Sequence, residues 1–135
     1  MPTILIADYD DDTRFIVRKT LEEMELDVVE ANTPLAAHRL ARGGVDAIVL
    51  NYPMQFADGV TLTRAIRADT QLASVPILNL TSHVTDVMLA DAAADGVTCT
   101  LAKPVNIEAI VGAIRSLLQK QAVSFSLSRH GRLGA

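Results

Sequence analysis

Short continuous apolar runs alternate with helical patterns along the chain, and this alternation limits the fold more than any other feature of the sequence. The five runs, each of strand length, are Ile4–Ala7, Asp27–Glu30, Ala47–Leu50, Ile77–Leu80 and Thr98–Ala102. They lack the polar alternation of a half-exposed strand, so they predict a parallel sheet that is covered on both faces. The expected fold is therefore α/β, a doubly wound five-stranded parallel sheet with helices on both faces.

The helical segments between and after these runs supply the cover. The last one, predicted from about Asn106 to Lys120, carries a single apolar stripe made of Ile107, Ile110, Val111, Ile114, Leu117 and Leu118. Asp11 or Asp12 is expected to cap the first helix, and Gly96 is expected to end a later one. Because residues 122–135 lose the periodicity, we predict one domain over residues 1–121 and a C-terminal tail or linker over residues 122–135.

Length and charge narrow the class of partner. The chain has 135 residues, half of them hydrophobic, which is enough for one well-buried domain. A net charge of -4 argues against nucleic acid and anionic membranes as partners, since both require clustered Lys and Arg.

No apolar run approaches the roughly 20 residues of a membrane span. The single cysteine, Cys99, cannot form an internal disulfide, and the absence of a secretory signal makes a reducing cytoplasm the expected compartment.

Four unlike polar residues follow four of the predicted strands. Asp8 follows the first strand, Asn51 the third, Thr81 the fourth and Lys103 the fifth. Parallel α/β sheets place ligand sites at the carboxyl ends of their strands, where the strand order reverses. We therefore expect an acid, an amide, a hydroxyl and an ammonium around one crevice, which suits an oxyanion with or without a divalent cation.

Four stretches carry a resemblance to a known family: ILIADYDDDTR, VDAIVLNYPMQFADG, VPILNLTS and DGVTCTLAKP. Over residues 3–120 the chain resembles the receiver domain of two-component response regulators, which implies the CheY-like, flavodoxin-like form of the fold. In that family a histidine kinase donates a phosphoryl group to an Asp after the third strand, and an acidic pair after the first strand holds Mg²⁺.

The resemblance assigns a role to each residue at the ends of the strands. By position, Asn51 stands at the phosphoacceptor, Asp8 and Tyr9 stand at the acidic pair, Thr81 is the switch hydroxyl and Lys103 is the lysine that meets the phosphoryl group. Asp10 is a further acid beside this acidic pocket.

Departures from the family's pattern affect every step of its chemistry. The amide of Asn51 is too weak a nucleophile to form an acyl phosphate. Tyr9 leaves Asp8 as the one firmly anionic metal ligand, so Mg²⁺ should bind weakly if at all. Pro53 has no N–H to offer a phosphoryl group. Thr100 stands where many receivers carry an aromatic residue that reports phosphorylation. The four departures together favour natural divergence over a single engineered change at Asn51.

We predict an atypical receiver that acts in phosphorelay signalling by binding protein partners, without the usual Asp phosphorylation, enzymatic activity or a required cofactor. A histidine kinase or an output protein would be the partner, and a homodimer is left open. In the crevice, we expect Lys103 to contact Asp8 directly or through water, with Asn51 accepting or donating a hydrogen bond beside the pair. The alternative is a small phosphatase of the haloacid-dehalogenase type, with Asp8 as nucleophile and Asp10 as acid/base.

Overall fold

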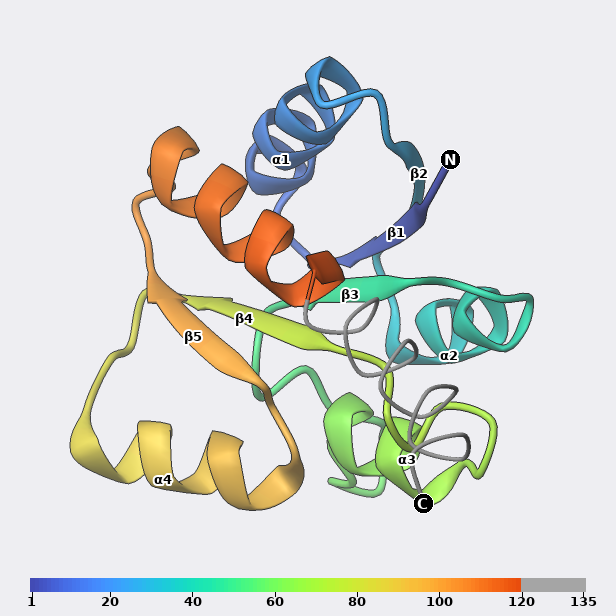
Figure 1. Ribbon diagram of the computed structural model, residues 1–135. Helices are drawn as coiled ribbons and strands as arrows, with labels where there is room; N and C mark the ends of the chain where they lie inside the picture. The colour runs from blue at the N-terminus through green and yellow to red at the C-terminus, as the bar shows by residue number, and fades with distance from the viewer. Residues whose placement is uncertain (120–135) are drawn as a thin grey trace, which may run out of the picture.

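In the computed structural model, which describes residues 1–119, five parallel strands form one sheet in the order β2-β1-β3-β4-β5 (Figure 1). The strands are β1 (Thr3–Ala7), β2 (Asp27–Ala31), β3 (Ala47–Leu50), β4 (Ile77–Thr81) and β5 (Cys99–Ala102). Each predicted strand is confirmed to within one residue at either end. The predicted domain boundary at residue 121 and the tail over residues 122–135 lie outside the described residues.

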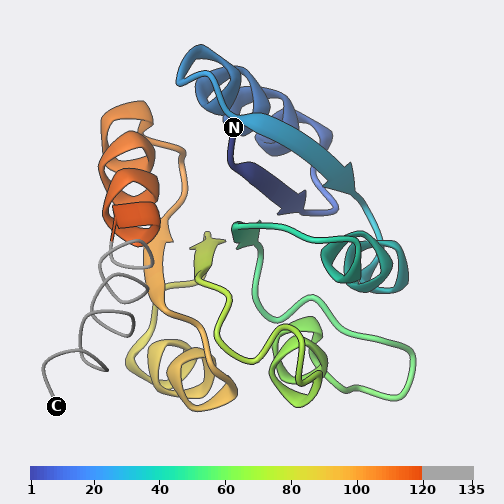
Figure 2. The same cartoon turned by 45° about the vertical axis from the view of Figure 1, so that its right-hand side comes forward.

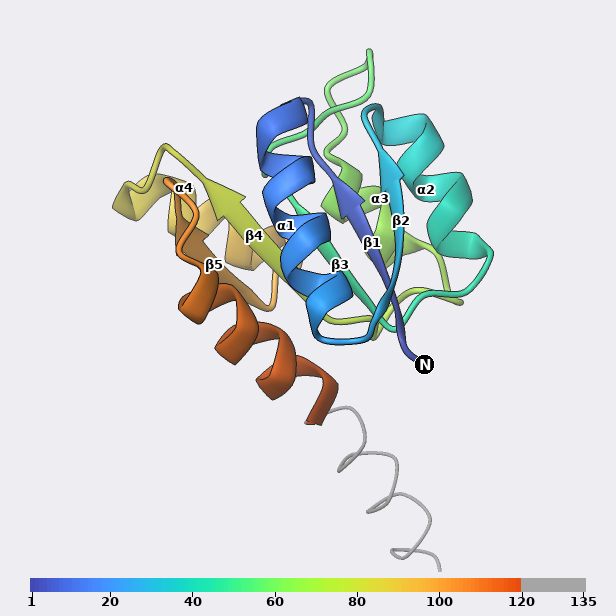
Figure 3. The same ribbon diagram turned by 90° about the horizontal axis from the view of Figure 1, so that it is seen from above.

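Helices cover both faces of the sheet, as the sequence predicts. They are α1 (Asp11–Glu23), α2 (Pro34–Arg42), α3 (Leu62–Ala68), α4 (Asp86–Asp95) and a last helix over residues 107–119, here called the C-terminal helix. Figures 2 and 3 show α1 and the C-terminal helix on one face, with α2, α3 and α4 on the other. None of the helices in residues 1–119 combines the length and the apolar character that a membrane-spanning segment needs.

Two apolar cores hold this arrangement, because alternate side chains of each strand point to opposite faces. Under α1 and the C-terminal helix lie Ile4, Ile6, Val49, Leu78 and Leu80, packed with Val17, Leu21, Ile110, Ile114 and Leu117. Under the other three helices lie Leu5, Ile48, Leu50 and Ile77, packed with Ala37, Ala41, Leu62, Ile66 and Ala92. The central strands are therefore apolar on both faces, which explains their continuous hydrophobic runs.

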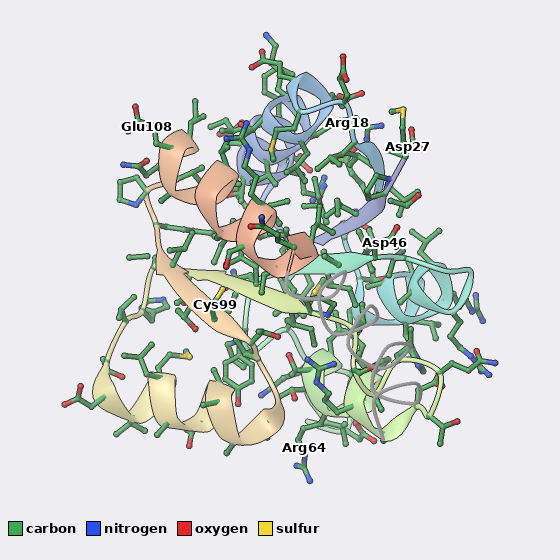
Figure 4. All side chains as sticks on the ribbon, in the orientation of Figure 1. Arg18, Asp27, Asp46, Arg64, Cys99 and Glu108 are labelled. Atoms are coloured by element: carbon green, nitrogen blue, oxygen red, sulfur yellow. The ribbon has the colours of Figure 1, made fainter. Side chains whose placement is uncertain are left out.

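Two expectations about burial need correction. Ile107 was assigned to the apolar stripe of the last helix, but its side chain is 56 % exposed because the helix begins at this residue, beyond the edge of the core. The sequence predicts that the strand containing Cys99 is covered on both faces, yet β5, on which Figure 4 labels Cys99, is an edge strand. Cys99 is only half-buried there.

The start of α1 also differs from the prediction. Asp10, rather than Asp11 or Asp12, is the N-cap, and its carboxylate accepts a hydrogen bond from Thr13 N at 3.2 Å. Asp11 and Asp12 lie in the first turn, where their charge favours the positive end of the helix dipole. The cap lies before the expected position because the helix begins directly after the loop that follows β1.

The strand order determines where a ligand site can form. β1 pairs with β2 on one side and with β3 on the other, so the chain reverses direction across the sheet between β1 and β3. Connections after these two strands diverge to opposite faces and leave a crevice at their carboxyl ends. The residues that follow β1 and β3 are Asp8 and Asn51.

Candidate functional site

Asp8 and Lys103 form a direct ion pair at the end of the sheet. Lys103 Nζ lies 3.0 Å from Asp8 Oδ2, and the side chains are only 16 % and 4 % exposed. Lys103 is held in place by its own backbone, because its N–H donates to Thr81 O at 2.8 Å. The predicted contact between Lys103 and Asp8 is confirmed, and it joins the ends of β1, β4 and β5.

The carboxylate of Asp8 is also satisfied on its other oxygen. Asp8 Oδ1 accepts the N–H of Asp10 at 2.9 Å, while Arg14 donates from Nη1 to the Asp8 carbonyl at 2.6 Å. Arg14 in turn pairs with Asp11 and lies 3.5 Å from Glu30 on β2. The loop after β1 is therefore tied to its neighbours through both its backbone and its side chains.

Asn51 is half-buried at the end of β3, at the position the sequence predicts for the centre of the crevice. Its surroundings assign the orientation of the amide: Nδ2 faces two backbone carbonyls and donates to Leu80 O at 3.1 Å and to Tyr52 O at 3.3 Å. The hydrogen bonds that Asn51 makes beside the ion pair are therefore to backbone carbonyls, one of which belongs to the end of β4.

The loop after β3 uses its backbone N–H groups internally. Asn51 N donates to Ala7 O at 3.2 Å, Tyr52 N to Asn79 Oδ1 at 2.8 Å and Met54 N to Asn51 O at 2.9 Å, and Pro53 has no N–H. A phosphoryl group needs donors that point at its oxygens. None of the N–H groups of residues 51–54 remains for that purpose.

Tyr52 connects this loop to the far end of α4. Its hydroxyl donates to Asp95 Oδ2 at 2.8 Å, and the same oxygen accepts from Thr61 Oγ1 at 3.0 Å. Arg64 Nε lies 3.8 Å from the other Asp95 oxygen, and Figure 4 shows the Arg64 side chain projecting outward from α3. Burial, together with the hydrogen bond and the charge of Asp95, raises the pKa of Tyr52 to about 12.

Asn79 is a part of the site that the sequence reasoning missed. It is fully buried in β4, where it accepts from Tyr52 N and donates from Nδ2 to Thr100 Oγ1 at 3.4 Å. Thr100 is its register partner on β5, so the amide links the crevice loop to the edge strand. The sequence did indicate Asn79, because it is a polar residue inside the apolar run ILNL. The link between Tyr52 and Asp95 had no comparable signal.

The four predicted residues do converge, although not all through side chains. Asp8 and Lys103 meet directly, and Thr81 contacts Lys103 through its backbone carbonyl. The side-chain amide of Asn51 donates to the carbonyl of Leu80, the neighbour of Thr81. The backbone N–H of Asn51 donates to the carbonyl of Ala7, the residue before Asp8. The Thr81 hydroxyl is buried and accepts the N–H of His83 at 3.2 Å. Asp10 is the exposed N-cap of α1, and its N–H donates to Asp8 Oδ1.

A cleft of about 420 Å³ opens beside Asn51. Its lining residues are Tyr9, Asn51, Pro53, Met54, Gln55 and Phe56. The lining is thus aromatic, apolar and amide in character, with no charged residue. Three of the sequence's departures from the receiver pattern, at Tyr9, Asn51 and Pro53, form walls of this one cleft.

Comparison with known proteins gives consistent relatives. Residues 4–115 match the model of the family described as "Response regulator receiver domain". RpaA of Synechocystis sp., named a DNA-binding dual master transcriptional regulator, is 32% identical over 124 residues, which are 89% of this chain and 50% of RpaA. The chemotaxis protein CheY of Pseudomonas aeruginosa is 28% identical over 119 residues, which are 87% of this chain and 96% of CheY.

The solved structures agree with the sequence relatives. Chemotaxis response regulator CheY4 of Vibrio cholerae superposes with a TM-score of 0.79 at 27% identity, over 87% of this chain and 99% of that one. This likeness confirms the expected CheY-like, flavodoxin-like fold. Neither the fold nor the relatives support the haloacid-dehalogenase-type alternative. With a family match that covers most of its length and the strand order of that fold, this chain belongs to the response regulator receiver domain family.

Proposed function

We propose that this chain is an atypical receiver in two-component phosphorelay signalling, which acts by binding protein partners without the usual Asp phosphorylation. The observation that carries the proposal is the half-buried amide of Asn51 at the end of β3, bonded to the carbonyls of Leu80 and Tyr52. An amide oxygen is a poor nucleophile, and the acyl phosphate that a carboxylate forms is not accessible to it. The module is a signalling element and not an enzyme.

The surroundings of Asn51 also disfavour a phosphoryl group that is bound without a covalent bond. The N–H groups of the loop after β3 are engaged internally, and Lys103 is paired with Asp8. An anion in the crevice would have to displace the ammonium from a nearly buried carboxylate. We infer that phosphate, sulfate and related anions bind here weakly.

Mg²⁺, which receivers commonly bind at this place, does not fit the residues present. Asp8 Oδ1 already accepts an N–H and Asp8 Oδ2 faces the ammonium of Lys103. Tyr9 contributes a phenol in place of a second carboxylate, and within residues 1–119 no three His, Cys, Asp or Glu side chains gather around a common point. Mg²⁺ prefers several hard, anionic oxygen ligands, so we propose that its affinity is low.

The partner is proposed from the family and from the acidic charge of the chain. Receiver domains interact with kinases and output domains, and we propose a protein of one of these two kinds. The chain spans half the length of the RpaA relative, so DNA binding by that longer protein is not carried over. We also propose that the chain can self-associate and that it is located in the cytoplasm.

The experiment that tests the proposal is incubation with acetyl phosphate and Mg²⁺, followed by intact-mass measurement. CheY of Pseudomonas aeruginosa serves as the positive control for the donor. We expect this chain to keep its mass, since no carboxylate occupies position 51. A gain of one phosphoryl mass on any carboxylate, such as Asp8 or Asp58, would show that the proposal is wrong.

A matched pair of variants separates the missing nucleophile from the altered surroundings. Asn51→Asp restores the carboxylate alone, and Asn51→Asp with Tyr9→Asp also restores the acidic pair. We expect the single variant to react more slowly than the double variant, because its metal ligands are still incomplete. Equal, rapid labelling of both variants would contradict the inference that Tyr9 weakens the metal site.

A further inference from the structure

We propose that the cleft beside Asn51 receives an arginine side chain from a segment of a partner protein. The inference rests on the proposed function, because it assumes a crevice that is free of phosphate and Mg²⁺. It goes further by naming the chemical group that the partner presents. The proposal is based on the cleft, its lining and the charges of the loops around it.

The lining of the cleft suits a flat group with an apolar stem. Tyr9 is 56 % exposed and Phe56 is half-buried, so both rings of the lining can be reached, while Met54 is a buried residue of the lining. Asn51 and Gln55 add amide groups. A volume of about 420 Å³ lies in the range of ligand-binding pockets, and this mixture of apolar walls and a few polar groups is typical of them.

The charges of the same loops select a cation. Asp10 follows Tyr9, Asp12 lies in the first turn of α1, and Asp58 lies two residues after Phe56 in the other loop that lines the cleft. The ion pairs recorded for residues 1–119 include none of these three carboxylates. The hydrogen bond from the Thr13 side chain lowers the pKa of Asp10 below its ordinary value, which favours its ionised form.

Two basic groups of the adjoining crevice, Lys103 and Arg14, are already engaged. Lys103 is paired with Asp8 at 3.0 Å, and Arg14 is paired with Asp11 and with the carbonyl of Asp8. The two loops that line the cleft therefore supply aromatic rings and carry surplus negative charge. A cation over an aromatic face beside carboxylates is the complementary ligand.

Arginine fits this environment better than lysine does. Its planar guanidinium stacks on aromatic rings, is more weakly hydrated than an ammonium and donates up to five N–H groups in a fixed plane. The side-chain carbonyls of amides and the carboxylates of the two loops accept such donors. A protein segment is the proposed source, because receiver domains act through protein partners and the cleft opens beside exposed Gln55 and Tyr9.

The test is an NMR titration of the full chain with two capped tripeptides, Gly-Arg-Gly and Gly-citrulline-Gly. Citrulline keeps the shape of arginine but replaces the guanidinium with a neutral urea group. We expect saturable shifts at Tyr9, Asn51, Gln55 and Phe56 with the arginine peptide, and at least tenfold weaker binding of the citrulline peptide. Added salt should weaken the arginine complex, because the carboxylates of the two loops are exposed.

Variants with matched controls locate the binding. Tyr9→Ala should weaken the arginine peptide about two- to fivefold, the range of one exposed cation–π contact. Asp10→Asn should also weaken it, since Asn retains the helix cap but removes the charge. Phe15→Ala, on an exposed ring of α1 that is 63 % accessible, should leave the affinity unchanged.

Three results would each overturn the inference: equal affinity for the citrulline peptide, no effect of Tyr9→Ala, or an equal loss from Phe15→Ala. The acetyl phosphate experiment tests the proposed function independently of the arginine peptide. A chain that stays unlabelled by acetyl phosphate and fails to bind the arginine peptide would retain the proposed function and lose this inference. A chain that is labelled would lose the proposed function itself.

Discussion

Replacing Lys103 by Met tests whether the crevice at the ends of β1, β3 and β5 is a fixed structural element. The substitution removes the ammonium that lies 3.0 Å from Asp8 Oδ2 and leaves a carboxylate whose side chain is only 4 % exposed. Asp8 keeps the N–H of Asp10 on its other oxygen, so part of its hydrogen bonding survives. We expect Lys103→Met to lower the free energy of unfolding by about 3 kcal/mol, the lower end of the range for breaking a buried pair.

The combined variant should be more stable than Lys103→Met alone. Two unit charges at 3.0 Å attract by about 5 to 6 kcal/mol at an effective dielectric constant near 20, and desolvation of both groups offsets most of this gain. Asp8→Asn with Lys103→Met removes both charges and both desolvation costs. We expect the double variant to lose about 1 to 2 kcal/mol, and Asp8→Asn alone to lose a similar amount, since Lys103 is 16 % exposed and its flexible stem can reach water.

Urea unfolding followed by far-UV circular dichroism measures the three free energies. Lys19→Met, an exposed lysine whose ammonium lies 5.8 Å from the Phe15 ring, is the matched control and should cost less than about 1 kcal/mol. A coupling energy of at least about 2 kcal/mol supports the fixed pair. If the effects of Asp8→Asn and Lys103→Met add to within about 0.5 kcal/mol, the two groups are independent and the reasoning fails.

Three other features of the fold give predictions of their own. The pKa of Tyr52 is raised from 10.0 to about 12, so its contribution to stability should be complete below pH 10 and be lost as the pH rises to 12; Tyr52→Phe should flatten this loss in urea melts. Gly96→Ala should lower the free energy of unfolding by about 2 to 4 kcal/mol, because φ is +111° and the new Cβ would lie 2.6 Å from Arg67 Cγ. Gly44→Ala, at φ +105° in open space, should lower it by only about 1 kcal/mol. Similar losses from the two variants would refute the steric explanation. Asn79→Leu should speed hydrogen exchange at the Tyr52 amide and destabilise the fold by about 1 to 3 kcal/mol, whereas an unchanged exchange rate would exclude the hydrogen bond from Tyr52 N.

The local pattern of the sequence determined the order and type of the elements. Runs such as Ala47–Leu50 are apolar at every position because both faces of a central parallel strand are covered, and this property can be read one residue at a time. The positions of Asp8 and Lys103 at strand ends followed from the same reading, since parallel strands bring their carboxyl ends to one edge, and their direct contact was expected from the resemblance to receiver domains. Gly96 was also readable as a helix stop, because a left-handed residue there favours glycine.

Tertiary structure decided which partner each polar group takes. The amide of Asn51 bonds Leu80 O rather than the ion pair, and Tyr52 reaches Asp95 across 43 positions of chain. Ile107 is exposed and Asp10 caps α1 because the helices begin at particular residues that periodicity locates only approximately. Hydrophobic patterning reports which face of an element is buried, but a hydrogen bond depends on distances of a few tenths of an ångström between segments remote in sequence. Those distances exist only after the sheet and its helices have packed.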